Sequence, residues 1–203
     1  MAAKHGTSQH GMDSNKMNKW IITVCFAAVA AAALLISKVQ PHTFIEEGED
    51  GALQNNSNSD APKVIESTEI TEFYCHFSVL DRMERDGLGS FDYYTMKAKR
   101  NGTMVKGFYY PAYRHDSKDL AYDFEADVTF MEKLQAILTE YDLAEYNGLN
   151  IYVNGLPNQY GADLSVTYAS KEQLTASNNQ DNFLSIDAMC ALKGLFSEYA
   201  MKK

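Results

Sequence analysis

Residues 91–114 read FDYYTMKAKRNGTMVKGFYYPAYR, and this stretch decides the fold. The dipeptide Asn101-Gly102 separates two runs that are rich in aromatic and β-forming residues, which is a strong indication of a β-hairpin. A two-residue loop at these positions predicts that Arg100 pairs with Thr103. The pairs farther from the loop are then Ala98 with Val105, Met96 with Gly107, and Tyr94 with Tyr109.

This register gives the hairpin two chemically different faces. One face is apolar and is expected to line the core, with Tyr94, Met96, Ala98, Val105 and Tyr109. The other face places Lys97 opposite Lys106, a like-charge pair that is destabilising unless something negative lies nearby. We select five residues of this second face as binding candidates: Tyr93, Lys97, Lys106, Phe108 and Tyr110. They indicate either an aromatic surface that binds an anion or two solvated lysines without a ligand.

The rest of the sequence predicts four more strands and two helices. Period-two alternation and β-forming residues predict strands over residues 68–80, 120–127, 163–169 and 172–177. Apolar residues at helical spacing predict helices over residues 129–142 and 185–201. The order is therefore roughly β-β-β-β-α-β-β-α, with tight turns and no parallel crossover. We expect an α+β domain, a mainly antiparallel sheet with two helices on one face.

The two predicted helices begin with different capping signals. Residues 129–132 (TFME) have the form of a capping box, whereas Ser185 is suited to cap the second helix. Gly194 lies inside that second helix, where it costs about 1 kcal/mol relative to alanine. This cost predicts that a neighbouring element packs closely against Gly194.

The apolar run from Trp20 to Ser37 predicts where the rest of the chain resides. At about 1.5 Å per residue it reaches roughly 27 Å, enough for a bilayer core of about 30 Å with slight thinning. Lys16 and Lys19 precede the run and acidic residues follow it, so the N-terminus is expected in the cytoplasm. The alternative is a cleaved signal peptide, because residues 28–30 and 31–33 both have a small-x-small cleavage pattern.

We therefore divide the chain of 203 residues into four segments. They are a cytoplasmic tail (1–19), a transmembrane signal anchor (20–37), a disordered tether of low apolar content (38–66) and an extracytoplasmic α+β domain (67–203). This domain has 13 Lys and Arg against 20 Asp and Glu, a net charge of −7. Its acidity disfavours nucleic acid and anionic lipid surfaces as partners. The expected location is the cell membrane, with a single pass and the C-terminal domain outside the cytoplasm.

Few groups in the sequence point to catalysis. We find no nucleophile elbow, phosphate loop or metal-ligand cluster, and we predict no cofactor, no metal and no catalytic residue. Cys75 and Cys190 are expected to point inward, as free thiols or as a disulfide. Asp123, Glu125 and Asp127 share one strand face. Their crowding fits either a carboxyl group of raised pKa in a hydrolase or an acidic edge strand that discourages aggregation.

Three stretches resemble a known family: residues 141–149 (YDLAEYNGL), 160–168 (YGADLSVTY) and 174–179 (LTASNN). The family is an uncharacterised group of exported, membrane-anchored or lipoprotein-like proteins from Gram-positive bacteria. In it, a helix ends in a Y-N/D-L-x-x-W-N-G-F turn, and D-G-x-S-F-S-L-type and I-x-A-S-G-type strands follow. Here Tyr146, Leu149 and Asn178 replace the tryptophan, the phenylalanine and the glycine. The resemblance implies an envelope location and this helix-strand-strand order, but no activity.

Together these features predict a membrane-anchored, extracytoplasmic binding module of unknown ligand rather than an enzyme. Its expected partners are the membrane, through the N-terminal helix, and an envelope protein or a small ligand, but not nucleic acid. The alternative is a cell-envelope hydrolase that uses the clustered acidic residues.

Overall fold

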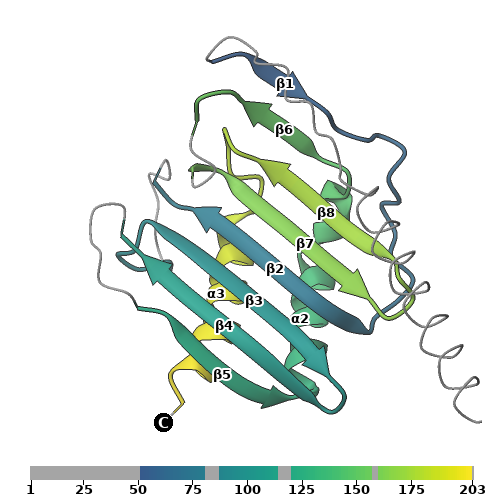
Figure 1. Ribbon diagram of the computed structural model, residues 1–203, viewed down its shortest axis with the longest axis vertical. Coiled ribbons are helices and arrows are strands. Elements are labelled where there is room, and N and C mark those ends of the chain that lie inside the picture. Colours follow the sequence, from purple (N-terminus) through teal and green to yellow (C-terminus); the bar gives the residue numbers. More distant parts are fainter. Residues whose placement is uncertain (1–50, 81–86, 114–119, 157–159, 203) are drawn as a thin grey trace, which may run out of the picture. The chain divides into compact units, whose positions relative to one another are not determined.

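The computed structural model describes residues 51–80, 87–113, 120–156 and 160–202. These residues contain an eight-stranded sheet in the order β1-β6-β8-β7-β2-β3-β4-β5 (Figure 1). The strands are β1 (Leu53–Asn55), β2 (Ile70–Ser78), β3 (Tyr93–Asn101), β4 (Met104–Ala112), β5 (Tyr122–Asp127), β6 (Asn150–Val153), β7 (Ala162–Tyr168) and β8 (Gln173–Asn178).

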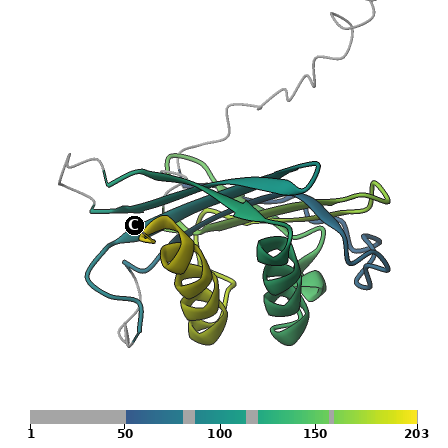
Figure 2. The same ribbon diagram turned by 90° about the horizontal axis from the view of Figure 1, so that it is seen from below.

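Two helices, α2 (Thr129–Glu140) and α3 (Ile186–Ala200), lie on the same face of the sheet (Figure 2). They contact each other, and α3 also contacts β4 and β5. A short 3-10 helix, η1 (Leu143–Tyr146), follows α2. This arrangement confirms the predicted fold class, α+β with a mainly antiparallel sheet and two helices on one face. The other face, which no described helix covers, is called the open face below.

The short strands β1 and β6 were not expected from the sequence. β1 pairs antiparallel with β6, with Gln54 opposite Tyr152. β6 pairs in parallel with β8, with Asn150 opposite Ser177. This is the one parallel pair among the described strands, so the sheet is mainly antiparallel, as predicted. Strands of three or four residues are too short to show the alternation on which a sequence-based prediction depends.

Residues 51–66 are ordered against the rest of the domain, which corrects the predicted start of the fold at residue 67. The Asn58 amide donates to the Gly148 carbonyl oxygen over 2.8 Å. The Asn147 side-chain amide donates to the Pro62 carbonyl oxygen over 2.8 Å, and Lys63 donates to the Asn147 carbonyl oxygen. The segment is ordered because its polar groups find partners in the turn after η1, and composition alone does not reveal those partners. Residues 38–50, the anchor and the tail lie outside the described residues.

β3 and β4 form the predicted hairpin, but their register differs from the prediction by two residues. Asn101 pairs with Met104, so Gly102 and Thr103 form the loop. Of these loop and flanking residues only Gly102 has a positive φ, 64°. The predicted loop also required a left-handed backbone at Asn101, and avoiding that strain favours the observed turn. Lys106 therefore faces Lys99 rather than Lys97. A shift of two residues nevertheless leaves every side chain on its predicted face.

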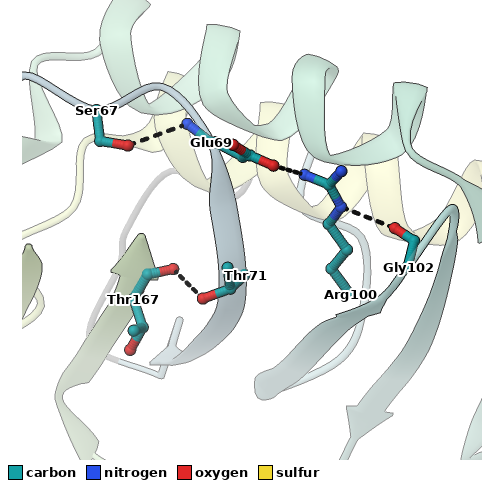
Figure 3. Close-up of polar contacts among 6 residues, drawn as sticks. All are labelled: Ser67, Glu69, Thr71, Arg100, Gly102 and Thr167. Atoms are coloured by element: carbon teal, nitrogen blue, oxygen red, sulfur yellow. Dashed lines mark hydrogen bonds and ion pairs between the residues drawn. The ribbon is translucent and has the colours of Figure 1, made fainter. Parts of the chain in front are cut away.

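Polar contacts fasten the hairpin loop to the start of β2 (Figure 3). Arg100 donates from Nε to the Gly102 carbonyl oxygen over 2.9 Å, and its guanidinium group pairs with Glu69. Thr71 donates from Oγ1 to the Thr167 carbonyl oxygen over 3.0 Å, where the β2–β7 register shifts. These contacts tie β2 to both of its neighbours, so they help to fix which side chains meet across the sheet.

The core lies between the sheet and the two helices. The five hairpin residues that were predicted to point inward, Tyr94, Met96, Ala98, Val105 and Tyr109, are all buried. Cys75 is also buried and Cys190 is half-buried, and no disulfide joins the two. Burial raises the pKa of the Cys75 thiol, so this group stays protonated at neutral pH.

The helix termini confirm one capping prediction and contradict another. Ser185 Oγ accepts a hydrogen bond from the Ala188 amide over 3.1 Å, as predicted. The predicted capping box is absent from α2, because Val128 is the N-cap and the Thr129 side chain donates to Asp127 instead. The prediction that a neighbouring element packs closely against Gly194 is also wrong. This glycine is exposed, and apart from the adjacent residues and backbone of its own helix, nothing lies within 4 Å of the position that a Cβ would take.

Within the described residues, no helix combines the length and the apolar character that crossing a bilayer requires. The predicted span, residues 20–37, lies outside them.

Candidate functional site

The open face presents a row of side chains that crosses six strands. Sheet pairing places the members of this row opposite one another, from β5 to β8: Asp123, Phe108, Lys97, Tyr74, Ser165 and Thr175. Most of their neighbours along each strand are core residues, and the neighbours of Asp123 are partly buried and pack against the core. Because side chains alternate between the faces of a strand, this row points away from the helices.

Lys97 lies at the middle of the row, between two aromatic rings. Its Nζ is 5.8 Å from the centroid of the Tyr74 ring and 5.6 Å from the centroid of the Phe108 ring. Both distances are within the range of cation–π attraction. The rings attract the ammonium group but do not neutralise its charge, so a positive charge remains available at the surface.

Two depressions adjoin each other at Tyr74. The first has a volume of ≈ 370 Å³, and its lining includes Lys97, Lys106 and Phe108. The second has a volume of ≈ 590 Å³, and its lining includes residues with amide, hydroxyl and carboxylate groups: Asn56, Asn58, Asn150, Asp163, Thr175 and Ser177. Tyr74 and Ser165 line both depressions. A single extended ligand could therefore occupy both.

The charges around the first depression are nearly balanced. Lys99 forms an ion pair with Glu72. Lys97 and Lys106 make no ion pair within 4.0 Å with any residue in the described part of the chain. Asp123 lines the same depression, so two unpaired ammonium groups stand beside carboxylates. This balance favours a ligand group with one negative charge over a group with two.

The five predicted binding residues all lie on the open face, but they do not form one cluster. Lys97, Lys106 and Phe108 line the first depression. Tyr110 stacks on Phe108, with 6.3 Å between the ring centroids. Tyr93 packs beside His76 at the far end of β3, outside both depressions. Their role in binding stays a prediction.

Sequence reasoning missed Tyr74 and Ser165 as members of the site, and it named Asp123 only as part of the acidic strand. The alternation along β2 turns Tyr74 away from Phe73 and Cys75, and this signal was present in the sequence. The pairing of β2 with both β3 and β7, which brings Tyr74 to Lys97, is non-local and had no signal. Burial raises the pKa of Tyr74, and the negative charge of Asp163 adds to the shift, so its hydroxyl group is a neutral donor at ordinary pH.

A second polar row lies beside the first. His76 Nδ1 is 2.9 Å from Thr95 Oγ1, and Ser177 donates to Asp163 over 2.5 Å. His76 and Asp163 are opposite each other in the β2–β7 pairing. Ser177 thus bonds to the carboxylate rather than to the imidazole, which differs from the nucleophile–base contact that activates a catalytic serine.

The acidic residues of β5 are exposed on an edge strand. A hydrogen bond from the Thr129 side chain lowers the pKa of Asp127. This direction is opposite to the raised pKa that a hydrolase would need at Asp127. In the part of the chain that the structure describes, no group of three or more His, Cys, Asp or Glu residues is placed to hold a metal ion.

No protein-family model, no curated protein and no solved structure matches this chain. The resemblance to exported Gram-positive proteins stays a prediction, and the site is argued from its geometry.

Proposed function

We propose that this protein is a membrane-anchored binding module outside the cytoplasm, and that its open face holds the ligand. The observation that carries this proposal is the Lys97 ammonium group between Tyr74 and Phe108, on a sheet face without a described helix. Aromatic side chains are enriched where proteins recognise partners. The two depressions also fall within the range of about 300–1,000 Å³ that is typical of ligand pockets.

The attachment to a membrane is supported by the sequence. The apolar run of residues 20–37 and the lysines before it have the length and charge bias of a signal anchor with its C-terminal side outside. We expect the full-length protein to stay with membranes after alkaline extraction, and protease added to intact cells to digest its C-terminal domain. Full-length protein released into the medium, with a new N-terminus near residue 31 or 34, would show a cleaved signal peptide instead.

Covalent labelling of amines tests the binding face. The full-length protein, reconstituted in nanodiscs of zwitterionic lipid, is labelled with and without solubilised cell-envelope fractions, of protein and of polysaccharide. We expect the ligand to protect Lys97 and Lys106, because both are exposed in the free protein. Lys133 on α2 is exposed as well and serves as the internal control. Protection of Lys133 alone, or of none of the three lysines with any envelope fraction, would contradict the proposal.

A further inference from the structure

The two depressions together define what a ligand must offer. The first presents the unpaired ammonium groups of Lys97 and Lys106 beside the Asp123 carboxylate, and this favours single negative charges. The second presents amide and hydroxyl groups that both donate and accept hydrogen bonds, and the Asp163 carboxylate, which accepts them. A matching ligand therefore carries an anionic group and several neutral hydroxyl groups along one chain.

The aromatic rings of the open face add a second requirement: the ligand must offer a flat, weakly polar surface on which they can stack. Tyr74 stands where the two depressions meet, and Phe108 lies on the other side of Lys97. A saturated ring can stack on such side chains through its C–H groups while its hydroxyl groups reach the polar lining. The side chains of the open face supply all these contacts.

An acidic peptide fits this face less well. Peptides that bind to sheets usually add a strand to a free edge, where main-chain hydrogen bonds provide the affinity. β2, β3 and β4 lie inside the sheet and are paired on both sides. Their backbone groups are therefore already satisfied and offer nothing to a peptide backbone.

We propose that the open face binds an acidic polysaccharide whose pyranose rings each carry one carboxylate. This inference rests on the proposed binding function and names the class of ligand. Lys97 and Lys106 bind the carboxylate in the first depression, and Tyr74 and Phe108 stack on the sugar rings. The hydroxyl groups of the adjoining sugar unit bind the polar lining of the second depression.

Three short probes separate charge from ring shape. Tetragalacturonate has both features, its fully methyl-esterified form keeps the rings without the charge, and tetra-L-glutamate keeps the charge without the rings. Short probes are used so that binding reports on the two depressions and not on the rest of the surface, since the chain has a net charge of −9. Calorimetry with the full-length protein in nanodiscs should show binding of tetragalacturonate. The other two probes should bind about 10-fold more weakly or less, since each lacks one set of contacts.

Variants of one residue then locate the site. Lys97→Met keeps the apolar stem between the rings but removes the charge, and we expect about 10-fold weaker binding of tetragalacturonate. Lys97→Gln is the second variant in case Lys97→Met does not fold, which thermal unfolding will show. Lys133→Gln is the matched control. Lys133 also lies over an aromatic ring, 5.2 Å from the Tyr199 centroid, but it belongs to α2, and its loss should leave the affinity unchanged.

Several results would overturn the inference. If the methyl ester binds as tightly as tetragalacturonate, the face does not recognise the negative charge. If tetra-L-glutamate binds as tightly as tetragalacturonate, an acidic peptide is the better ligand. Absence of tetragalacturonate binding, together with protection of Lys97 and Lys106 by an envelope fraction, would reject this ligand class and leave the binding face standing. Absence of both would reject the inference and the proposed function together.

Discussion

Gly107 lies in β4 at a position where an alanine has no room for its Cβ. The ring of Phe124, which is paired with Gly107 on the neighbouring strand, covers this glycine on the core side. Even the third-nearest ring carbon would lie only 2.5 Å from an added Cβ. Carbon atoms in contact prefer about 3.5–4.0 Å. Gly107→Ala therefore requires the Phe124 ring to move.

The ring has little freedom to move, because other aromatic rings surround it. Its centroid is 5.3 Å from Phe130, 5.9 Å from Phe196 and 6.0 Å from Tyr199. Overpacking costs about 1–3 kcal/mol, and each displaced aromatic pair loses about 0.5–1.5 kcal/mol more. The lower entropy of alanine in the unfolded chain returns about 0.4–1 kcal/mol. We expect Gly107→Ala to lower the free energy of unfolding by about 1–3 kcal/mol.

Urea unfolding of a fragment of residues 48–203, followed by far-UV circular dichroism, measures this change. The fragment corresponds to the compact unit Gly48–Lys203. For a domain of this size each kcal/mol also lowers the melting temperature by about 2–4 °C. The control is the same substitution in a Phe124→Ala background, where no ring opposes the new methyl group. We expect almost no cost there. An equal cost in both backgrounds would refute the steric reasoning.

Three further predictions concern stability. Gly194→Ala should raise the free energy of unfolding by about 1 kcal/mol in the same urea assay, because this helical glycine is exposed and an added Cβ meets nothing; a loss of stability would mean that Gly194 is packed. Glu172 accepts hydrogen bonds from Ser170 and from two backbone amides before β2, and these bonds lower its pKa below the ordinary 4.5. The stabilising contribution of Glu172 should be present above pH 4.5 and should disappear as the pH falls through the lowered pKa. A carbon-13 NMR titration measures this pKa, and the Glu172→Gln variant should lack this part of the pH dependence of stability. A fragment of residues 67–203 should be less stable than residues 48–203 by on the order of 2 kcal/mol, because it loses the β1–β6 pairing and the bonds to the turn after η1; equal urea midpoints would contradict this.

The local parts of the fold could be predicted from the sequence. The hairpin followed from Asn101-Gly102, and the assignment of its faces survived an error in register, because the error was an even number of residues. The long strands and both helices had clear periodicity. β1 and β6 had none, and their existence depends on partners that are distant in the sequence. The segment of residues 51–66 is ordered through non-local contacts of the same kind, and composition does not encode these contacts.

The candidate site divides in the same way. The hairpin pattern alone determines which side chains share a face with Lys97. The sequence therefore predicted Lys106, Phe108 and Tyr110 as its neighbours on that face. Tyr74 is brought to Lys97 by the pairing of β2 with β3, which no short-range signal predicts. The apolar side chains of the hairpin also predicted which face lines the core, and the helices cover that face, so the lysine face stays open.

Of the two lysines in the proposed site, Lys97 is expected to contribute more to anion binding than Lys106, because of the observed register. The like-charge neighbours are Lys99 and Lys106, and carboxylates flank this pair on both sides, with Glu72 opposite Lys99 and Glu125 opposite Lys106. That pair therefore needs no ligand to be tolerated. Lys97 instead has aromatic rings on both sides, and these leave its charge without a counter-charge. We expect Lys97→Gln to weaken binding of tetragalacturonate more than Lys106→Gln does, at equal thermal stability of the two variants. The reverse order in calorimetry would place the anion over β4 and β5 and would separate the aromatic rings from the binding of charge.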